Sequence, residues 1–140
     1  MITKEELNPH CYGLTDEQEK NQKELLIRIN KLRAAWGKPM IGTSGVRSAE
    51  EHVNIYRKKA EKAGQVFDIT KVPMLSKHLF GAAWDVSDPK GELYAFCQKD
   101  KEKALEDADL WVEKDTKGWV HFQMLPYGSY KKGKSRFFKP

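Results

Sequence analysis

The fold is decided by residues 76–87, which read SKHLFGAAWDVS. Residues 83–87 predict a short strand, and side chains along a strand point alternately to its two faces. Asp85 therefore points away from Trp84 and Val86, whose side chains supply an apolar face for the core. This strand offers both a core-forming face and a face that carries a carboxylate.

A hairpin later in the chain shows the same division. Its predicted strands are residues 110–113 and 119–123, and the five polar, turn-forming residues 114–118 join them. His121 points with Trp119 and Gln123, away from Val120 and Phe122, which supply the core face of this strand. With a five-residue loop, Glu113 pairs with the first residue of the second strand. Glu113 then lies on the face of His121, one diagonal step away.

Three further segments predict helices that flank this sheet. Apolar residues recur in them at helical spacing, and capping residues open the first two. The predicted helices run from Thr15 to Gly37, from Ser48 to Gly64 and from Glu92 to about Asp107. With another short strand at residues 40–44, the pattern predicts an α+β fold, a small and mostly antiparallel sheet flanked by helices, in a single domain of residues 1–140.

The composition limits the classes of function. The chain has 140 residues, a net charge of +5 and a pI near 9.1, which favour approach to an anionic polymer. No helix-turn-helix, zinc-finger or RNP element supports nucleic-acid binding. No apolar run suits a signal peptide or a membrane span, so we expect the protein in the cytoplasm of the producing cell, acting on the cell wall after release, without stable membrane insertion. We also expect a monomer. The tail at residues 131–140 either contacts an anionic envelope or packs its two phenylalanines on the domain.

Two histidines and a carboxylate are candidates for a metal site. His78 lies seven residues before Asp85, but Gly81 between them allows the backbone to fold back. His78, Asp85 and His121 can then converge. Three such ligands leave Zn2+ with an open fourth position, as a catalytic zinc site requires. The alternative from spacing alone is that hydrogen bonds satisfy both histidines and Asp85 begins a turn.

Three motifs in this order resemble those of the M15-type zinc peptidases. SKHLFGAAWD matches the signature SxHxxGxAxD, with His78 and Asp85 at ligand positions. WVHFQ, with His121, is similar to the segment that carries the third ligand. GTSGVRS at residues 42–48 is similar to an upstream SGxRS element, whose arginine, here Arg47, faces the substrate in relatives.

The resemblance extends from about residue 37 to residue 138. It implies the small α+β fold shared by D-alanyl-D-alanine carboxypeptidases and phage L-alanyl-D-glutamate endopeptidases, with zinc as cofactor. Many members carry a carboxylate three residues before the last ligand as general base, but this chain has Gly118 there. Glu113 is the candidate base because it shares the face of the last ligand, and Asp115 in the hairpin loop is its rival.

Arg47 can bind a substrate carboxylate through paired hydrogen bonds, or it can form a surface ion pair with Glu50 or Glu51. We expect a peptidoglycan peptidase of the phage endolysin type, which hydrolyses a stem-peptide amide bond, with L-alanyl-D-glutamate favoured. A D,D-carboxypeptidase or dipeptidase of the same family is the second hypothesis. The third is a non-catalytic, zinc-containing module that binds the wall or belongs to a virion, and Gly118 keeps it open.

Overall fold

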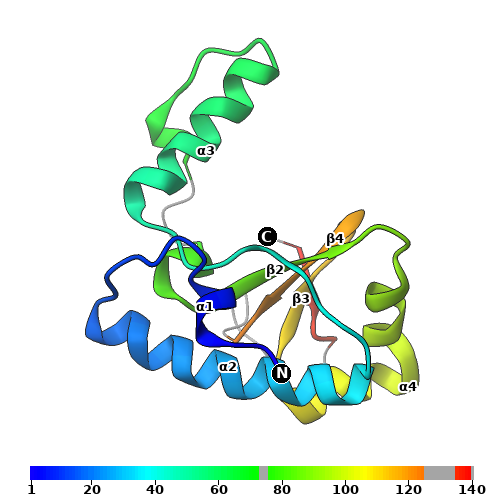
Figure 1. Ribbon diagram of the computed structural model, residues 1–140. Coiled ribbons are helices and arrows are strands. Elements are labelled where there is room, and N and C mark those ends of the chain that lie inside the picture. The colour runs from blue at the N-terminus through cyan, green and yellow to red at the C-terminus, as the bar shows by residue number, and fades with distance from the viewer. Residues whose placement is uncertain (73–75, 125–134, 140) are drawn as a thin grey trace.

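The computed structural model describes residues 1–72, 76–124 and 135–139. Within these residues a five-stranded sheet, in the order β1-β2-β4-β3-β5, lies over two long helices, α2 and α4 (Figure 1). Neighbouring strands are antiparallel except β3 and β5, which are parallel. The strands are β1 (Gly42–Ser44), β2 (Ala83–Asp88), β3 (Trp111–Glu113), β4 (Gly118–Gln123) and β5 (Phe137–Phe138). The predicted α+β fold is confirmed.

The three long helices begin and end close to the predicted residues. Thr15 caps α2 by accepting a hydrogen bond from Gln18, and Gly37 ends the helix in a left-handed conformation. No helix among the described residues is long and apolar enough to cross a membrane. The helices are α1 (Lys4–Leu7), α2 (Asp16–Trp36), α3 (Ala49–Lys62) and α4 (Glu92–Ala108), with 3-10 turns η1 (Ile69–Lys71) and η2 (Lys77–Phe80).

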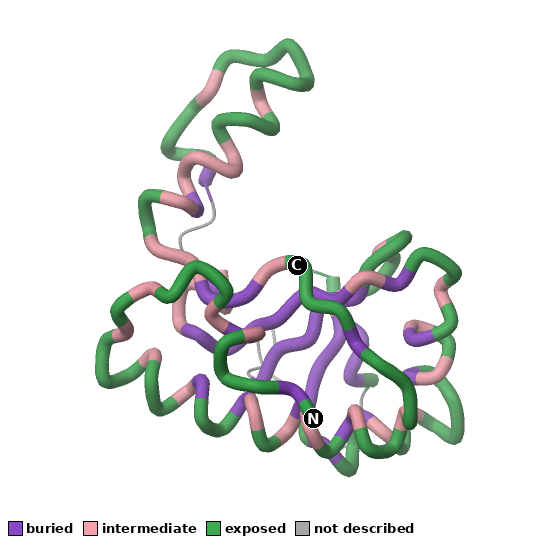
Figure 2. The backbone as a smooth tube through the Cα atoms, viewed as in Figure 1, coloured by how far each residue is buried: buried purple, intermediate pink, exposed green. Residues whose placement is uncertain are grey.

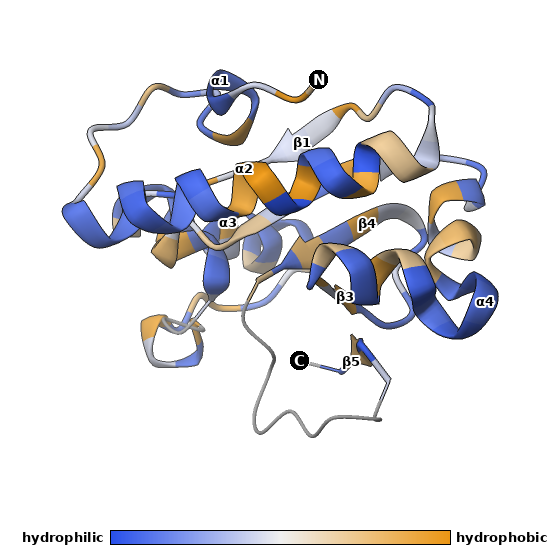
Figure 3. Cartoon of the chain, turned by 90° about the horizontal axis from the view of Figure 1, so that it is seen from below, coloured by the Kyte–Doolittle hydropathy of each residue, from blue (hydrophilic) through white to orange (hydrophobic). Residues whose placement is uncertain are grey.

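The core lies between the sheet and α2 and α4. Figure 2 shows the strands as the main buried part of the chain, and Figure 3 shows the apolar stretch of α2 crossing the sheet. Burial of one such large apolar side chain contributes about 1.5–3 kcal/mol to folding. Residues of this core include Leu25, Ile29 and Leu32 from α2, Trp84 and Val86 from β2, Leu93, Cys97 and Leu105 from α4, and Val120 and Phe122 from β4.

The prediction of one continuous helix at residues 92–107 is wrong in its middle. Residues 99–102 have non-helical backbone angles, and three of them have positive φ. This part of the helix has no apolar side chain to hold it against the core. The break lets the Glu102 carboxylate accept hydrogen bonds from Ser135 Oγ at 2.6 Å and from the backbone N–H of Arg136 at 2.7 Å. The kink therefore anchors the segment that leads into β5.

The strand β5 was not predicted. Its residue Phe137 is buried and packs edge-on against Tyr94, with ring centroids 5.1 Å apart. Arg136 is also buried and bonds to acidic groups of α4 and its end. The described part of the basic tail is thus packed on the domain, whereas residues 131–134 and 140 lie outside the described residues.

A helical arm projects from the body on the side of the sheet that faces away from α2 (Figure 1). It consists of α3 and the segment that returns from it at residues 65–72. Ser48 caps the base of α3 by accepting a hydrogen bond from the backbone N–H of Glu51. Apart from its base, the arm is half-buried to exposed along most of its length (Figure 2).

Candidate metal centre

Four strands each contribute one side chain to a row across one face of the sheet. This face is the one opposite α2 and α4, and we call it the open face. The register pairs Ser44 of β1 with Asp85 of β2, and Asp85 with His121 of β4. The β3–β4 register pairs Val112 with Phe122, and carried one residue further it sets Glu113 opposite His121. Because directly opposed residues lie about 4.5–5.5 Å apart, the row brings two acids and an imidazole together.

This register corrects one prediction. Glu113 does not pair with Trp119, because the hairpin loop is longer than five residues. The backbone of Asp115 in that loop has a left-handed conformation, with φ of 62°, and its N–H donates to Tyr94 Oη at 3.2 Å. The observed partner of Glu113 is two residues away from the predicted one. Because two is an even number, Glu113 lies on the predicted face of the sheet, but directly opposite His121.

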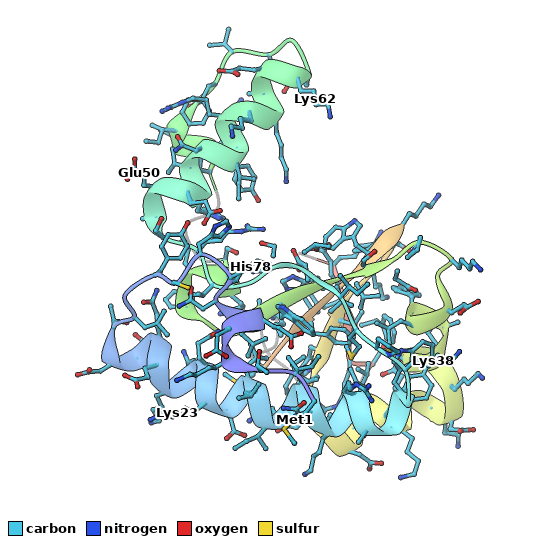
Figure 4. All side chains as sticks on the ribbon, viewed as in Figure 1. Met1, Lys23, Lys38, Glu50, Lys62 and His78 are labelled. Atoms are coloured by element: carbon cyan, nitrogen blue, oxygen red, sulfur yellow. The ribbon has the colours of Figure 1, made fainter. Side chains whose placement is uncertain are left out.

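His78 reaches the same place from η2. Gly81 ends this turn with φ of +69°, a conformation that favours glycine, and β2 begins two residues later. Three amide side chains of α2 donate hydrogen bonds to the last carbonyls of the turn. These are Gln18 to Leu79 at 2.9 Å, Asn21 to Phe80 at 2.8 Å and Gln22 to Gly81 at 2.8 Å. Figure 4 shows His78 below the base of α3, between the arm and the sheet.

A backbone carbonyl orients the His78 ring. His78 Nδ1 lies 2.8 Å from the carbonyl oxygen of Gly45, and the backbone N–H of Arg47 donates to the His78 carbonyl at 3.1 Å. Gly45 is packed so closely that a Cβ atom there would lie 2.1 Å from the carbonyl oxygen of Leu7. The loop therefore needs glycine at this position to bring its carbonyl to the histidine.

The three predicted ligands converge. His78, Asp85 and His121 are 3%, 8% and 8% exposed, and their candidate ligand atoms all lie within 4.8 Å of one another. Asp85 Oδ1 is 3.2 Å from His78 Nε2 and 2.8 Å from His121 Nδ1. For bonds of about 2.0–2.2 Å to zinc, neighbouring ligand atoms of a tetrahedral site lie about 3.3 Å apart. The group could hold a metal ion.

The hydrogen atoms of His78 give a second argument for a cation. Both of its contacts, the Gly45 carbonyl and the Asp85 carboxylate, only accept hydrogen bonds. A neutral imidazole has one N–H, so it can satisfy only one of them. Burial lowers the pKa of His78, which works against the doubly protonated form. A metal ion between Nε2 and Asp85 resolves the conflict, because Nδ1–H then donates to Gly45 and Nε2 offers its lone pair.

Asp85 is the anionic centre of the cluster. Burial disfavours its charged form, but hydrogen bonds with His121 and His78 outweigh burial and hold its pKa well below the ordinary value. Burial alone would lower the pKa of His121, but the hydrogen bond with Asp85 and the negative charge of Asp85 outweigh burial and raise this pKa. The carboxylate therefore stays ionised and available to a cation.

Gln123 orients the second histidine, a role that was not predicted. His121 Nε2 lies 2.9 Å from Gln123 Oε1, so an Nε2–H can donate to the amide and leave Nδ1 towards Asp85. Gln123 is buried two residues along β4 on the same face. That spacing, a polar residue two positions from a candidate ligand on one strand, was readable in the sequence.

Arg47 lies beside the cluster and not in a surface ion pair with Glu50 or Glu51. Its Nε and one terminal nitrogen donate to Ser44 Oγ at 3.2 and 3.1 Å, and that terminal nitrogen is 3.8 Å from Asp85 Oδ2. Its other terminal nitrogen is 3.3 Å from Nδ1 of His52, which is fully buried. Arginine only donates, so His52 Nδ1 accepts. The sequence did not identify His52 as a partner.

The two candidate bases differ in position. Glu113 is half-buried, and burial raises the pKa of its carboxyl, with the charge of Asp85 acting in the same direction and that of His121 against it. Asp115 is exposed in the hairpin loop, and its carboxylate lies 3.8 Å from the ammonium of Lys139. Gly118 begins β4 and offers no side chain. The geometry favours Glu113 over Asp115 as the acid next to the cluster.

No family model matches the sequence, and neither the curated proteins nor the solved structures contain a match.

Proposed function

We propose that this protein is a zinc-dependent peptidase that hydrolyses an amide bond in the stem peptide of peptidoglycan. The observation that carries the proposal is the buried group of His78, Asp85 and His121, in which His78 faces two hydrogen-bond acceptors. Two imidazoles and one carboxylate suit zinc and leave a position open. The motif resemblance supplies the peptide substrate.

A bound zinc ion would supply Lewis acidity, which polarises a carbonyl group and makes water more acidic. The residues of this chain would divide the remaining tasks. Glu113, opposite His121, would accept a proton at its carboxylate from the attacking water and pass it to the leaving amine. Arg47, held by Ser44 and His52 and close to Asp85, would bind a substrate carboxylate through N–H groups that do not take part in these contacts.

The test is digestion of purified peptidoglycan by zinc-loaded protein, with a chelated control and identification of new termini by mass spectrometry. New N-terminal D-glutamate would support the endopeptidase, and released D-alanine would support the carboxypeptidase. Products that do not depend on the metal, or no products from several wall types despite bound zinc, would contradict the proposal. The second outcome would favour the non-catalytic module that Gly118 suggests.

The role of Glu113 has its own test. Glu113→Gln should lower kcat by roughly 10²- to 10⁴-fold, the usual contribution of a general base, while zinc affinity stays similar. Asp115→Asn is the matched control, since it removes the rival carboxylate from the exposed loop and should leave kcat nearly unchanged. If Asp115→Asn caused the larger loss, the assignment of the base would be reversed.

A further inference from the structure

One side of α3 connects the candidate metal centre to the outer part of the arm. Arg47 contacts His52 at the base of the helix, with 3.3 Å between the two nitrogens. The rings of His52 and Tyr56 have centroids 5.1 Å apart, and the ammonium of Lys59 lies 4.8 Å from the centroid of the Tyr56 ring. Residues 52, 56 and 59 follow helical spacing, so they form one face of α3.

This face of α3 begins at the row of side chains on the sheet, because His52 contacts Arg47 and Arg47 contacts Ser44 and lies 3.8 Å from Asp85 Oδ2. Tyr56 is half-buried, and burial raises its pKa, with the charge of Arg47 opposing the rise and that of Glu113 adding to it. Through these contacts Tyr56 and Lys59 continue this face of α3 outward from Arg47.

Lys59 is available to a ligand. It is exposed, and within residues 1–72, 76–124 and 135–139 no carboxylate lies within 4 Å of its ammonium. Tyr56 and Lys59 also line a hollow of about 590 Å³ between α3 and residues 65–72. The aromatic ring restrains the ammonium of this exposed residue through a cation–π contact.

We propose that Tyr56 and Lys59 form an outer subsite for a second carboxylate of the substrate, while Arg47 binds a first one close to the metal centre. The inference rests on the proposed function and narrows it. The ligand is a peptide with two carboxylates, and the arm serves as one wall of the binding site. Neutral peptides, and peptides in which one of these carboxylates is an amide, are poorer ligands.

The test is calorimetric binding to chelator-treated protein, so that no turnover is needed. The probes are L-alanyl-γ-D-glutamyl-L-lysyl-D-alanine and two analogues, each with one of its carboxylates converted to an amide. Lys59→Gln should weaken binding of the diacid about three- to fivefold, as expected for an exposed charge pair. The same substitution should not change the affinity for the analogue whose amide replaces the carboxylate that Lys59 binds. Lys58→Gln removes the same charge from a neighbouring position of α3 and should change nothing.

A further variant tests the ring. Tyr56→Phe keeps the platform and should retain the affinity for the diacid, whereas Tyr56→Leu should lower it as Lys59→Gln does. The subsite would be overturned if Lys59→Gln lost the same affinity for all three peptides, or if Lys58→Gln lost as much affinity as Lys59→Gln. It would also be overturned if the unaltered protein did not measurably bind the diacid. Peptide binding that depends on Lys59, without hydrolysis of the wall, would support the subsite and contradict the proposed function. Hydrolysis of the wall, with peptide binding that does not depend on Lys59, would support the proposed function and contradict the subsite.

Discussion

The two faces of the sheet differ in chemistry although the same strands form both. On the face towards α2 and α4, Trp84 and Phe122 are fully buried among apolar side chains. On the other face their immediate neighbours Asp85 and His121 pair through a 2.8 Å contact. Side chains alternate along a strand, so one residue separates the core from the candidate metal centre. Substitutions on the two faces should therefore have separable effects.

The largest expected effect on stability is on the core face. Phe122→Ala should lower the free energy of unfolding by about 3–5 kcal/mol, because it leaves a cavity among packed side chains. Trp119→Ala is the matched substitution on the open face of the same strand, where the tryptophan is 37% exposed, and it should cost much less. Urea denaturation of the metal-free proteins measures both. Equal losses would mean that the open face also carries core packing.

The next effect concerns the open face alone. Gln123→Leu should weaken zinc binding by roughly 10- to 100-fold, because His121 loses the acceptor that orients its ring. Gln123→Glu retains an acceptor and should recover most of the affinity. Gln98→Leu, on the exposed part of α4, is the control and should not change it. Competition with a chromophoric chelator gives the three affinities; a Gln98→Leu protein as weak as Gln123→Leu would contradict a local role.

The smallest effect is a pKa change at Glu113. In metal-free protein its carboxyl should titrate above the ordinary glutamate value, because burial disfavours the charged form. Zinc should then lower this pKa, since a nearby positive charge stabilises the carboxylate. Carboxyl carbon shifts in an NMR titration measure both steps, with Glu92 of α4 as a distant control. A Glu113 pKa that does not respond to zinc would place this residue outside the site.

The faces of the sheet could be predicted from sequence more safely than the pairing of its strands. Alternation alone assigned Asp85 and His121 to the open face. The partner of Glu113 depended on the length of the hairpin loop, and one residue of that loop, Asp115, contacts Tyr94 of α4, which is distant in the sequence. Its face was still right, because the shift was by an even number of residues.

Contacts between segments far apart in the chain could not be predicted. The amides of α2 that hold η2 lie about 60 residues from it, and no local pattern links the two. The short strand β5 depends on Glu102 at a break in α4, which interrupts an otherwise ordinary helical pattern. By contrast, Gln123 stands at strand spacing from His121 and was a signal that alternation could have supplied.

The most direct test of the metal centre is a calorimetric titration of zinc into the unaltered protein and into His121→Ala, with His10→Ala as the exposed-histidine control. We predict one zinc ion per chain, with affinity about 10²- to 10³-fold weaker in His121→Ala, because one ligand contributes about 3–4 kcal/mol. His10→Ala should bind like the unaltered protein. A folded protein that binds no zinc, or a His121→Ala protein that binds it unchanged, would contradict the assignment of His78, Asp85 and His121 as a metal site.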